Sequence, residues 1–169
     1  MNIRAAIPAD APAIAAIQVA AWRAAYRGHM PDAALDELDV SAGSLMWGKL
    51  LQSDHAITVA EDAGQTVAFC CVVPSRDPDH NPDSDAEISA IHVDPKHWRR
   101  GAGRALCTAA FAAAADSAFA KIVLWVLSTN AAAIRFYEAM GFQPDFATKS
   151  ETVAEGVLVQ LVRLRRNLP

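Results

Sequence analysis

The sequence predicts one α/β domain, with helices early in the chain and a mixed sheet. Its 169 residues suit a single domain with a sizeable core, and a hydrophobic content of 53% is typical of a folded globular protein. Apolar residues recur at helical spacing near the N-terminus, whereas later apolar runs are short and bounded by turn residues, as strands are. No repeat or linker interrupts the chain, so we expect residues 1–169 to form one domain.

The first third of the chain is predicted to be mostly helical. Residues 2–6 form a short strand-like segment that ends before Pro8. From residue 8 to about residue 26 the apolar positions follow a helical period, and Pro8 or Pro12 suits a first helical turn. Residues 27–31 break this pattern. A second helix, or a pair of short ones, follows with apolar positions at Leu35, Leu38, Leu45, Trp47 and Leu50.

Strands are predicted in the middle of the chain. Residues 56–61 and 66–73 flank a turn at residues 62–65 and predict a hairpin. Residues 74–85 are rich in proline and aspartate, and we expect a solvated loop there. A metal site is the less favoured alternative, because no ligand spacing recurs. Another strand follows at residues 86–93.

Three further strands are predicted in the last third of the chain. Residues 121–127, with the sequence KIVLWVL, are nearly all apolar, as in an interior strand that is buried on both faces. Residues 143–149 and 156–164 predict the last two strands.

A strand, a glycine-bearing turn and a helix follow one another in residues 91–106. The strand is broken by Pro95, because proline lacks the amide donor that a ladder needs. A basic turn at residues 98–103 leads into a long alanine-rich helix that starts near Gly103. The first amides of a helix have no partner within it, and the helix dipole favours an anion there. This order of elements predicts a phosphate-binding turn.

The side chains of this turn support phosphate binding. Gly101 and Gly103 let the backbone approach an anion without a Cβ in the way. Arg99, Arg100 and Arg104 add positive charge and forked donors that suit phosphate oxygens. A turn that only requires glycine is the alternative interpretation. No Lys-Ser or Lys-Thr pair follows the glycines and a third fingerprint glycine is missing, so a P-loop NTPase and a dinucleotide fold are disfavoured.

Composition argues against several other classes of protein. The net charge of -4 is small, so we expect no nucleic acid partner and no binding to an anionic membrane. The N-terminus lacks the pattern of a signal peptide, and no run approaches the roughly 20 apolar residues of a membrane span. Cys70, Cys71 and Cys107 are odd in number, which favours reduced, buried thiols over disulfides or a metal site. We expect a cytoplasmic protein without a metal.

A second motif follows the apolar strand. Residues 131–140 predict a short helix that is capped by Asn130. Gly141 takes the position just after the helix, and Phe142 can pack back on Tyr137, as in a Schellman ending.

Together these motifs resemble the GNAT superfamily of N-acetyltransferases. The resemblance rests on V-x-P followed by the arginine-rich G-x-G turn, on the strand KIVLWVL, and on the pattern N-x-x-A-x-x-F-Y-E-x-x-G-F. It spans nearly the whole chain, from the segment IRAA onward. The third pattern is matched by Asn130, Ala133, Phe136, Tyr137, Glu138, Gly141 and Phe142.

The resemblance implies a GNAT fold: a twisted, mixed and mostly antiparallel sheet of about seven strands with four or so flanking helices. Its central fourth and fifth strands would splay apart, with acetyl-CoA in the gap. Ile91, His92 and Val93 would offer strand backbone to the cofactor, and Asn130, Ala133 and Phe136 would line the opposite wall. The family often has Gln or Arg where this chain has Trp98. The pyrophosphate would be wrapped by the amides of Arg99, Arg100, Gly101, Ala102, Gly103 and Arg104.

The resemblance also implies two catalytic residues. Tyr137 would be the acid for the departing thiolate, and its alternative role is that of a core aromatic residue. Glu87 is the leading base, acting through water, and a solvated strand glutamate is its alternative. Strict alternation puts Glu87 on the face opposite His92, the second candidate, and a bulge would change that register. A backbone amide near His92 or Val93 would meet the oxyanion.

The acceptor pocket is expected around the first break between helices, with help from the final hairpin. Trp22, Tyr26 and His29, together with Arg27, would build it, although aromatic residues at helical spacing also suit a core. Asp145 and Glu151 could attract a cationic acceptor, with ordinary surface charge as the default interpretation.

We therefore expect an enzyme that transfers the acetyl group of acetyl-CoA directly to a primary amine of a small molecule or peptide. Cys107 lies inside a helix, so a covalent acetyl-enzyme is not expected. The alternatives are a non-catalytic acyl-CoA-binding or sensing module on the same fold and a transferase for a longer acyl-CoA. Exposed edge strands often pair, so we favour a homodimer.

Overall fold

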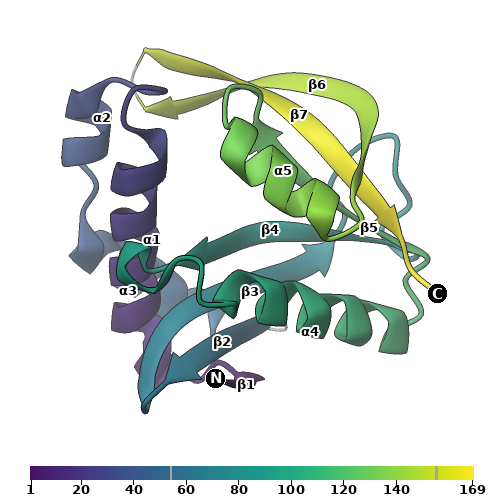
Figure 1. Ribbon diagram of the computed structural model, residues 1–169, viewed down its shortest axis with the longest axis horizontal. Coiled ribbons are helices and arrows are strands. Elements are labelled where there is room, and N and C mark those ends of the chain that lie inside the picture. Colours follow the sequence, from purple (N-terminus) through teal and green to yellow (C-terminus); the bar gives the residue numbers. More distant parts are fainter. Residues whose placement is uncertain (54, 155) are drawn as a thin grey trace.

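The computed structural model describes residues 1–53, 55–154 and 156–169. Five helices, two short 3-10 turns and seven strands follow one another within this part of the chain (Figure 1). The first half contains β1 (Asn2–Ala5), η1 (Pro8–Asp10), α1 (Ala11–Tyr26), α2 (Asp32–Asp36), α3 (Val40–Leu50), β2 (Ala56–Asp62) and β3 (Gln65–Pro74). The second half contains β4 (Asp85–Val93), η2 (Pro95–His97), α4 (Ala102–Asp116), β5 (Lys121–Leu127), α5 (Ala131–Ala139), β6 (Gln143–Ala154) and β7 (Val157–Asn167).

The strands form one sheet in the order β1-β2-β3-β4-β5-β7-β6, and all neighbours are antiparallel except β4 and β5. Alternating side chains of the strands serve two cores. Ile57, Phe69 and Cys71 pack with α1 and α3 on one face, whereas Cys70 and Ile122 pack with α4 on the other. The predicted mixed, mostly antiparallel sheet of seven strands is thus confirmed.

The central parallel pair is very short. β4 and β5 are paired only at residues 85–87 with residues 121–123, and beyond Glu87 and Val123 the two strands separate. In Figure 1 the strands from β1 to β4 form one half of the sheet, and β5, β7 and β6 form the other. The two halves diverge toward the side on which α1 and α2 lie. Residues 88–93 of β4 therefore have β3 as their only strand neighbour in the described chain.

A β-bulge at Ser89 changes the register of β4. Val72 pairs with Ile88 and Cys71 pairs with Ala90, so Ser89 is the extra residue. The prediction of strict alternation was wrong for this reason: Glu87, Ala90 and His92 share the face of α1, while Ile88, Ile91 and Val93 pack on the face of α4. The memberships of the two cores agree with this register, since Ala90 contacts the α1 side and Ile88 the α4 side.

The proline-rich loop between β3 and β4 is mostly exposed, as expected, but several of its acidic side chains form ion pairs. Asp77 and Asp79 pair with the buried Arg163, and the buried Asp85 pairs with the partly exposed Lys121. These aspartates therefore contact cations on β5 and β7, which are distant in sequence.

The described residues lack two features. No helix there combines the length and hydropathy of a membrane span. No group of three or more metal-ligating side chains is assembled in the same part of the chain.

Candidate active site

The turn before α4 presents a row of backbone donors. α4 begins at Ala102, one residue earlier than expected, and Gly101 precedes it in a left-handed conformation with φ +91°. Arg99 is also left-handed, with φ +60°, and such residues curl a turn so that neighbouring amides converge. Within the described chain, the amides of residues 99–104 donate no hydrogen bond to a protein acceptor. The turn therefore has the form of an anion cradle.

The two glycines of the turn have different roles. A Cβ on Gly101 would meet nothing within 4 Å, so its left-handed backbone is what requires glycine. A Cβ on Gly103 would lie 3.2 Å from Cζ of Phe136 and 3.7 Å from Cγ2 of Val93. Gly103 thus lets the start of α4 approach α5 closely, a packing role that the sequence did not suggest.

Trp98 ties the turn to the end of β4. Its indole Nε1 donates to the carbonyl oxygen of Val93 at 2.7 Å, while 43% of the residue stays exposed. The turn continues to Arg104, which also lines a surface hollow of about 500 Å³ that runs along α4 to Arg166. A ligand held at the turn has room to continue along this helix.

α5 carries the second motif at the separation of the strands. The side chain of Asn130 accepts a hydrogen bond from the amide of Ala133 at 3.1 Å, which confirms the predicted N-cap. The predicted Schellman ending is also confirmed, since the amides of Gly141 and Phe142 donate to the carbonyl oxygens of Glu138 and Tyr137.

Tyr137 is half-buried between Phe136 and Phe142, whose ring centroids lie 5.2 and 5.9 Å from its own. Burial raises the pKa of its phenol well above the ordinary value, and the nearby Cys107 thiol contributes in the same direction. The phenol therefore keeps its proton at neutral pH and is available as a donor.

Glu87 lies at the last residue of β4 that pairs with β5, and only 5% of it is exposed. Its carboxylate accepts three hydrogen bonds from Arg76, from the backbone N at 3.3 Å, from Nε at 3.2 Å and from Nη2 at 2.6 Å. The alternative of a solvated glutamate does not apply. Sequence reasoning missed Arg76, because nothing in the pattern of residues 74–85 distinguishes it from a surface residue.

His92 shares the face of Glu87 because of the bulge. The indole Nε1 of Trp22 donates to Nε2 of His92 at 3.2 Å, so this nitrogen is the unprotonated one. Burial lowers the pKa of His92 from 6.5 to about 4, which keeps the imidazole neutral at physiological pH. Phe69 packs beside the ring at a centroid distance of 5.5 Å.

The proposed acceptor residues lie together at the end of α1. The rings of Trp22 and Tyr26 pack edge to face at 5.3 Å, and both contact a small apolar cluster that joins α2, β5 and the final hairpin. His29 is exposed, and its Nδ1 lies 2.9 Å from Oγ1 of Thr129 in the loop after β5. Arg27 is held outside this group by ion pairs of 3.1 Å with two aspartates of α2.

The two acidic residues considered for attracting a cationic acceptor differ in their contacts. The Asp145 carboxylate accepts from Nε of Arg163 at 2.7 Å and shares this arginine with Asp77 and Asp79, so three carboxylates face one guanidinium. Glu151 remains exposed and lies 3.7 Å from Nζ of Lys149.

The fold places a turn whose amides have no acceptor in the described chain beside an open strand pair. The sequence profile of the Acetyltransferase (GNAT) family matches residues 12–142. A probable N-acetyltransferase of Mycobacterium tuberculosis is 29% identical over an alignment of 177 positions that covers 100% of this chain and 96% of that protein. The chain therefore belongs to the GNAT family, and it is an acyltransferase.

Solved structures agree with this assignment. YncA of Salmonella typhimurium, solved with its cofactor acetyl-CoA, superposes with a TM-score of 0.75 at 25% identity, covering 100% of this chain and 94% of that chain. PaiA N-acetyltransferase of Thermoplasma acidophilum, in complex with coenzyme A, has a TM-score of 0.78 at 14% identity with 98% of both chains covered, and supports the fold alone.

Proposed function

We propose that this protein transfers the acetyl group of acetyl-CoA directly to a primary amine of a small molecule or peptide. The separation of β4 from β5 beyond Glu87 carries this proposal, because it leaves an open strand edge beside an anion cradle. Relatives of the same family and fold contain acetyl-CoA or coenzyme A, which supports the choice of donor.

The residues of the cradle fit such a donor. The amides of residues 99–104 would bind the pyrophosphate, with Arg99, Arg100 and Arg104 adding charge. Strand backbone at Ile91, His92 and Val93 would hold the arm that leads to the thioester, opposite Asn130, Ala133 and Phe136. When bound, acetyl-CoA supplies an activated acetyl group on a thiol leaving group.

Tyr137 is the proposed acid. Its phenol keeps its proton because burial raises its pKa, and it lies on α5 at the opening between the strands. It would donate that proton to the departing thiolate. The proposed base is Glu87, acting on the acceptor amine through water, with Arg76 holding the carboxylate in place. His92 is neutral and hydrogen-bonded to Trp22, and it is the second candidate.

The acceptor would enter from the face that carries Glu87 and His92. Trp22, Tyr26 and His29 border this face, and the cluster that contains Trp22 and Tyr26 includes residues of the final hairpin.

Release of the free thiol of coenzyme A from acetyl-CoA, measured with a panel of amines and peptides, tests the proposal. We expect release with one class of amine, and we expect Tyr137→Phe to lower kcat by about 10² to 10⁴ while retaining the parent's melting temperature, because a positioned acid contributes that much. Tyr26→Phe removes a hydroxyl at the chain's other tyrosine and should change the acceptor KM rather than kcat.

Two outcomes would contradict the proposal. Undiminished turnover in Tyr137→Phe removes this residue from the mechanism. Tight binding of acetyl-CoA without release by any acceptor favours the non-catalytic module or a longer acyl donor.

A further inference from the structure

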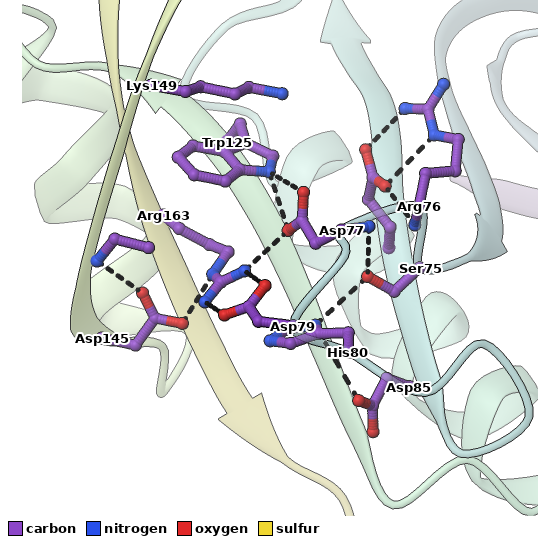
Figure 2. Close-up of polar contacts among 12 residues, drawn as sticks. Ser75, Arg76, Asp77, Asp79, His80, Asp85, Trp125, Asp145, Lys149 and Arg163 are labelled. Carbon is purple, nitrogen blue, oxygen red and sulfur yellow. Dashed lines mark hydrogen bonds and ion pairs between the residues drawn. The ribbon is translucent and has the colours of Figure 1, made fainter.

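A cluster of ion pairs around a buried arginine lies on the face of the sheet opposite α4 and α5 (Figure 2). Arg163 of β7 is 5% exposed, and its guanidinium is paired with three carboxylates. Its Nη1 lies 2.9 Å from Asp77, its Nη2 lies 2.6 Å from Asp79, and its Nε lies 2.7 Å from Asp145. A buried charge of this kind is tolerated only with such complete pairing, so the cluster fixes the position of each partner.

The cluster joins the two halves of the sheet. Asp77 and Asp79 belong to the loop before β4, whereas Arg163 belongs to β7. Asp77 also accepts a hydrogen bond from Nε1 of Trp125 at 3.0 Å. Trp125 lies on β5 two residues beyond Val123, where backbone pairing with β4 has ended. Side-chain contacts therefore replace the ladder where the strands begin to separate.

The loop before β4 also contacts the Glu87 carboxylate, through Arg76. Arg76 directly precedes Asp77, and both the backbone N and the guanidinium of Arg76 donate to the Glu87 carboxylate. Figure 2 shows Arg76 and Asp77 side by side, with Asp77 directed to Trp125 and Arg163. The Arg76 guanidinium is itself largely exposed, and both of its neighbours in the chain are anchored, Ser75 by the backbone of Asp85 and Asp77 by Trp125 and Arg163.

We propose that Asp77 and Arg163 are positioning residues that set the opening between β4 and β5 and hold Arg76 against Glu87. The proposal rests on the proposed function in assigning Glu87 as the base. Asp77 acts through two connections, one to β5 and β7 and one along the chain to Arg76. Asp79 contacts Arg163 as well, but among the described contacts it has no link to Trp125 or Glu87.

Asp77→Ala and Asp79→Ala form a matched pair. Each removes one carboxylate from Arg163, but only the first cuts the link to Trp125 and releases Arg76. We expect Asp77→Ala to lower kcat by about tenfold to hundredfold, the effect of a small misplacement of a reacting group, and Asp79→Ala to keep kcat within about twofold. Asp77→Asn and Asp79→Asn repeat the comparison if an alanine variant fails to fold.

A double-mutant cycle tests the connection through Arg76. If Asp77 acts in part through Arg76, the variant with both Asp77→Ala and Arg76→Ala should lose less kcat than the two single losses combined. Two readouts do not need turnover: hydrogen exchange of the Arg76 amide and the affinity for acetyl-CoA. Both should change in Asp77→Ala and neither in Asp79→Ala.

Equal effects of the two alanine variants, or additive losses in the cycle, would overturn the positioning role. Failure of the proposed function can be distinguished from failure of the positioning role. If the parent protein has no turnover, hydrogen exchange and acetyl-CoA affinity can still be compared between Asp77→Ala and Asp79→Ala, and they test the positioning role alone.

Discussion

The ionisation of His92 makes the stability of the folded protein depend on pH. Its pKa in the folded protein is about 4, below the value of 6.5 for a free histidine. Between these two pH values the unfolded chain binds a proton that the folded chain does not, so the free energy of unfolding falls as the pH decreases through this window. The folded protein loses at most about 3 kcal/mol of unfolding free energy in this way, with no loss above pH 6.5 and the full loss below pH 4.

Urea unfolding between pH 4.5 and 7.5 measures this effect. We expect His92→Gln to flatten the dependence of unfolding free energy on pH, because it removes the titrating ring but keeps an acceptor for Trp22. The exposed His55 offers a matched control, and His55→Gln should preserve the slope of the parent. If His92→Gln kept the parent's dependence of unfolding free energy on pH, the buried His92 would not be its cause.

Among single residues, those inside local motifs could be predicted from the sequence. Asn130 and Gly141 have roles in capping α5 that follow from neighbours within a few residues. Arg76, Asp77 and Arg163 could not be predicted, because their partners lie 11 to 86 residues away. Charges in a proline-rich loop resemble solvated charges until the fold brings a buried arginine to them.

The C-terminal end of α5 is held by Gly141 and by a contact with β7. Gly141 has φ +86°, and a Cβ there would overlap with Nη1 of Arg166. Arg166 donates to the carbonyl oxygen of Met140, so displacing it also removes a hydrogen bond from the end of the helix. The tail of β7 therefore holds the C-terminus of the helix that carries Tyr137.

Gly141→Ala and Gly28→Ala separate the two costs. Gly28 has φ +85° and open space around its Cβ position. Gly28→Ala should cost about 1 kcal/mol for the left-handed backbone alone. Gly141→Ala should cost about 1 to 3 kcal/mol more, because it displaces Arg166 as well. Urea midpoints provide the comparison, and equal losses would show that Arg166 adjusts freely.

β4 shows why an element can be predicted without its register. Its existence follows from its apolar content, but adjacent apolar residues at Ala90 and Ile91 fit either face. The bulge at Ser89 resolves this ambiguity through pairing with β3, and it brings Glu87 and His92 to one face. Local pattern cannot supply that choice, because it depends on which core each residue joins.

The molecule as a whole encloses all three of its cysteines. Cys70 and Cys107 lie in the core under α4, Cys71 lies in the core under α1, and each is free and buried. Burial raises the pKa of all three thiols, that of Cys107 to about 12. The reactive thiolate is therefore scarce in the folded protein.

Labelling with a disulfide reagent should consequently report unfolding. We expect no thiol to react while the protein is folded and three to react in concentrated urea. The labelling rate at intermediate urea should follow the unfolded fraction. Rapid reaction of one thiol without loss of structure would contradict this, and the alanine replacement of each cysteine in turn identifies the residue responsible.

The short ladder between β4 and β5 has a consequence for engineering. The turn at residues 98–103 and Glu87 belong to one side of this seam, and Tyr137 and the final hairpin belong to the other. With the proposed roles of these residues, the geometry of catalysis depends on how the two blocks meet. Substitutions that strengthen either block internally should combine freely, whereas changes along the seam, even at residues that touch no ligand, should be those that alter the rate.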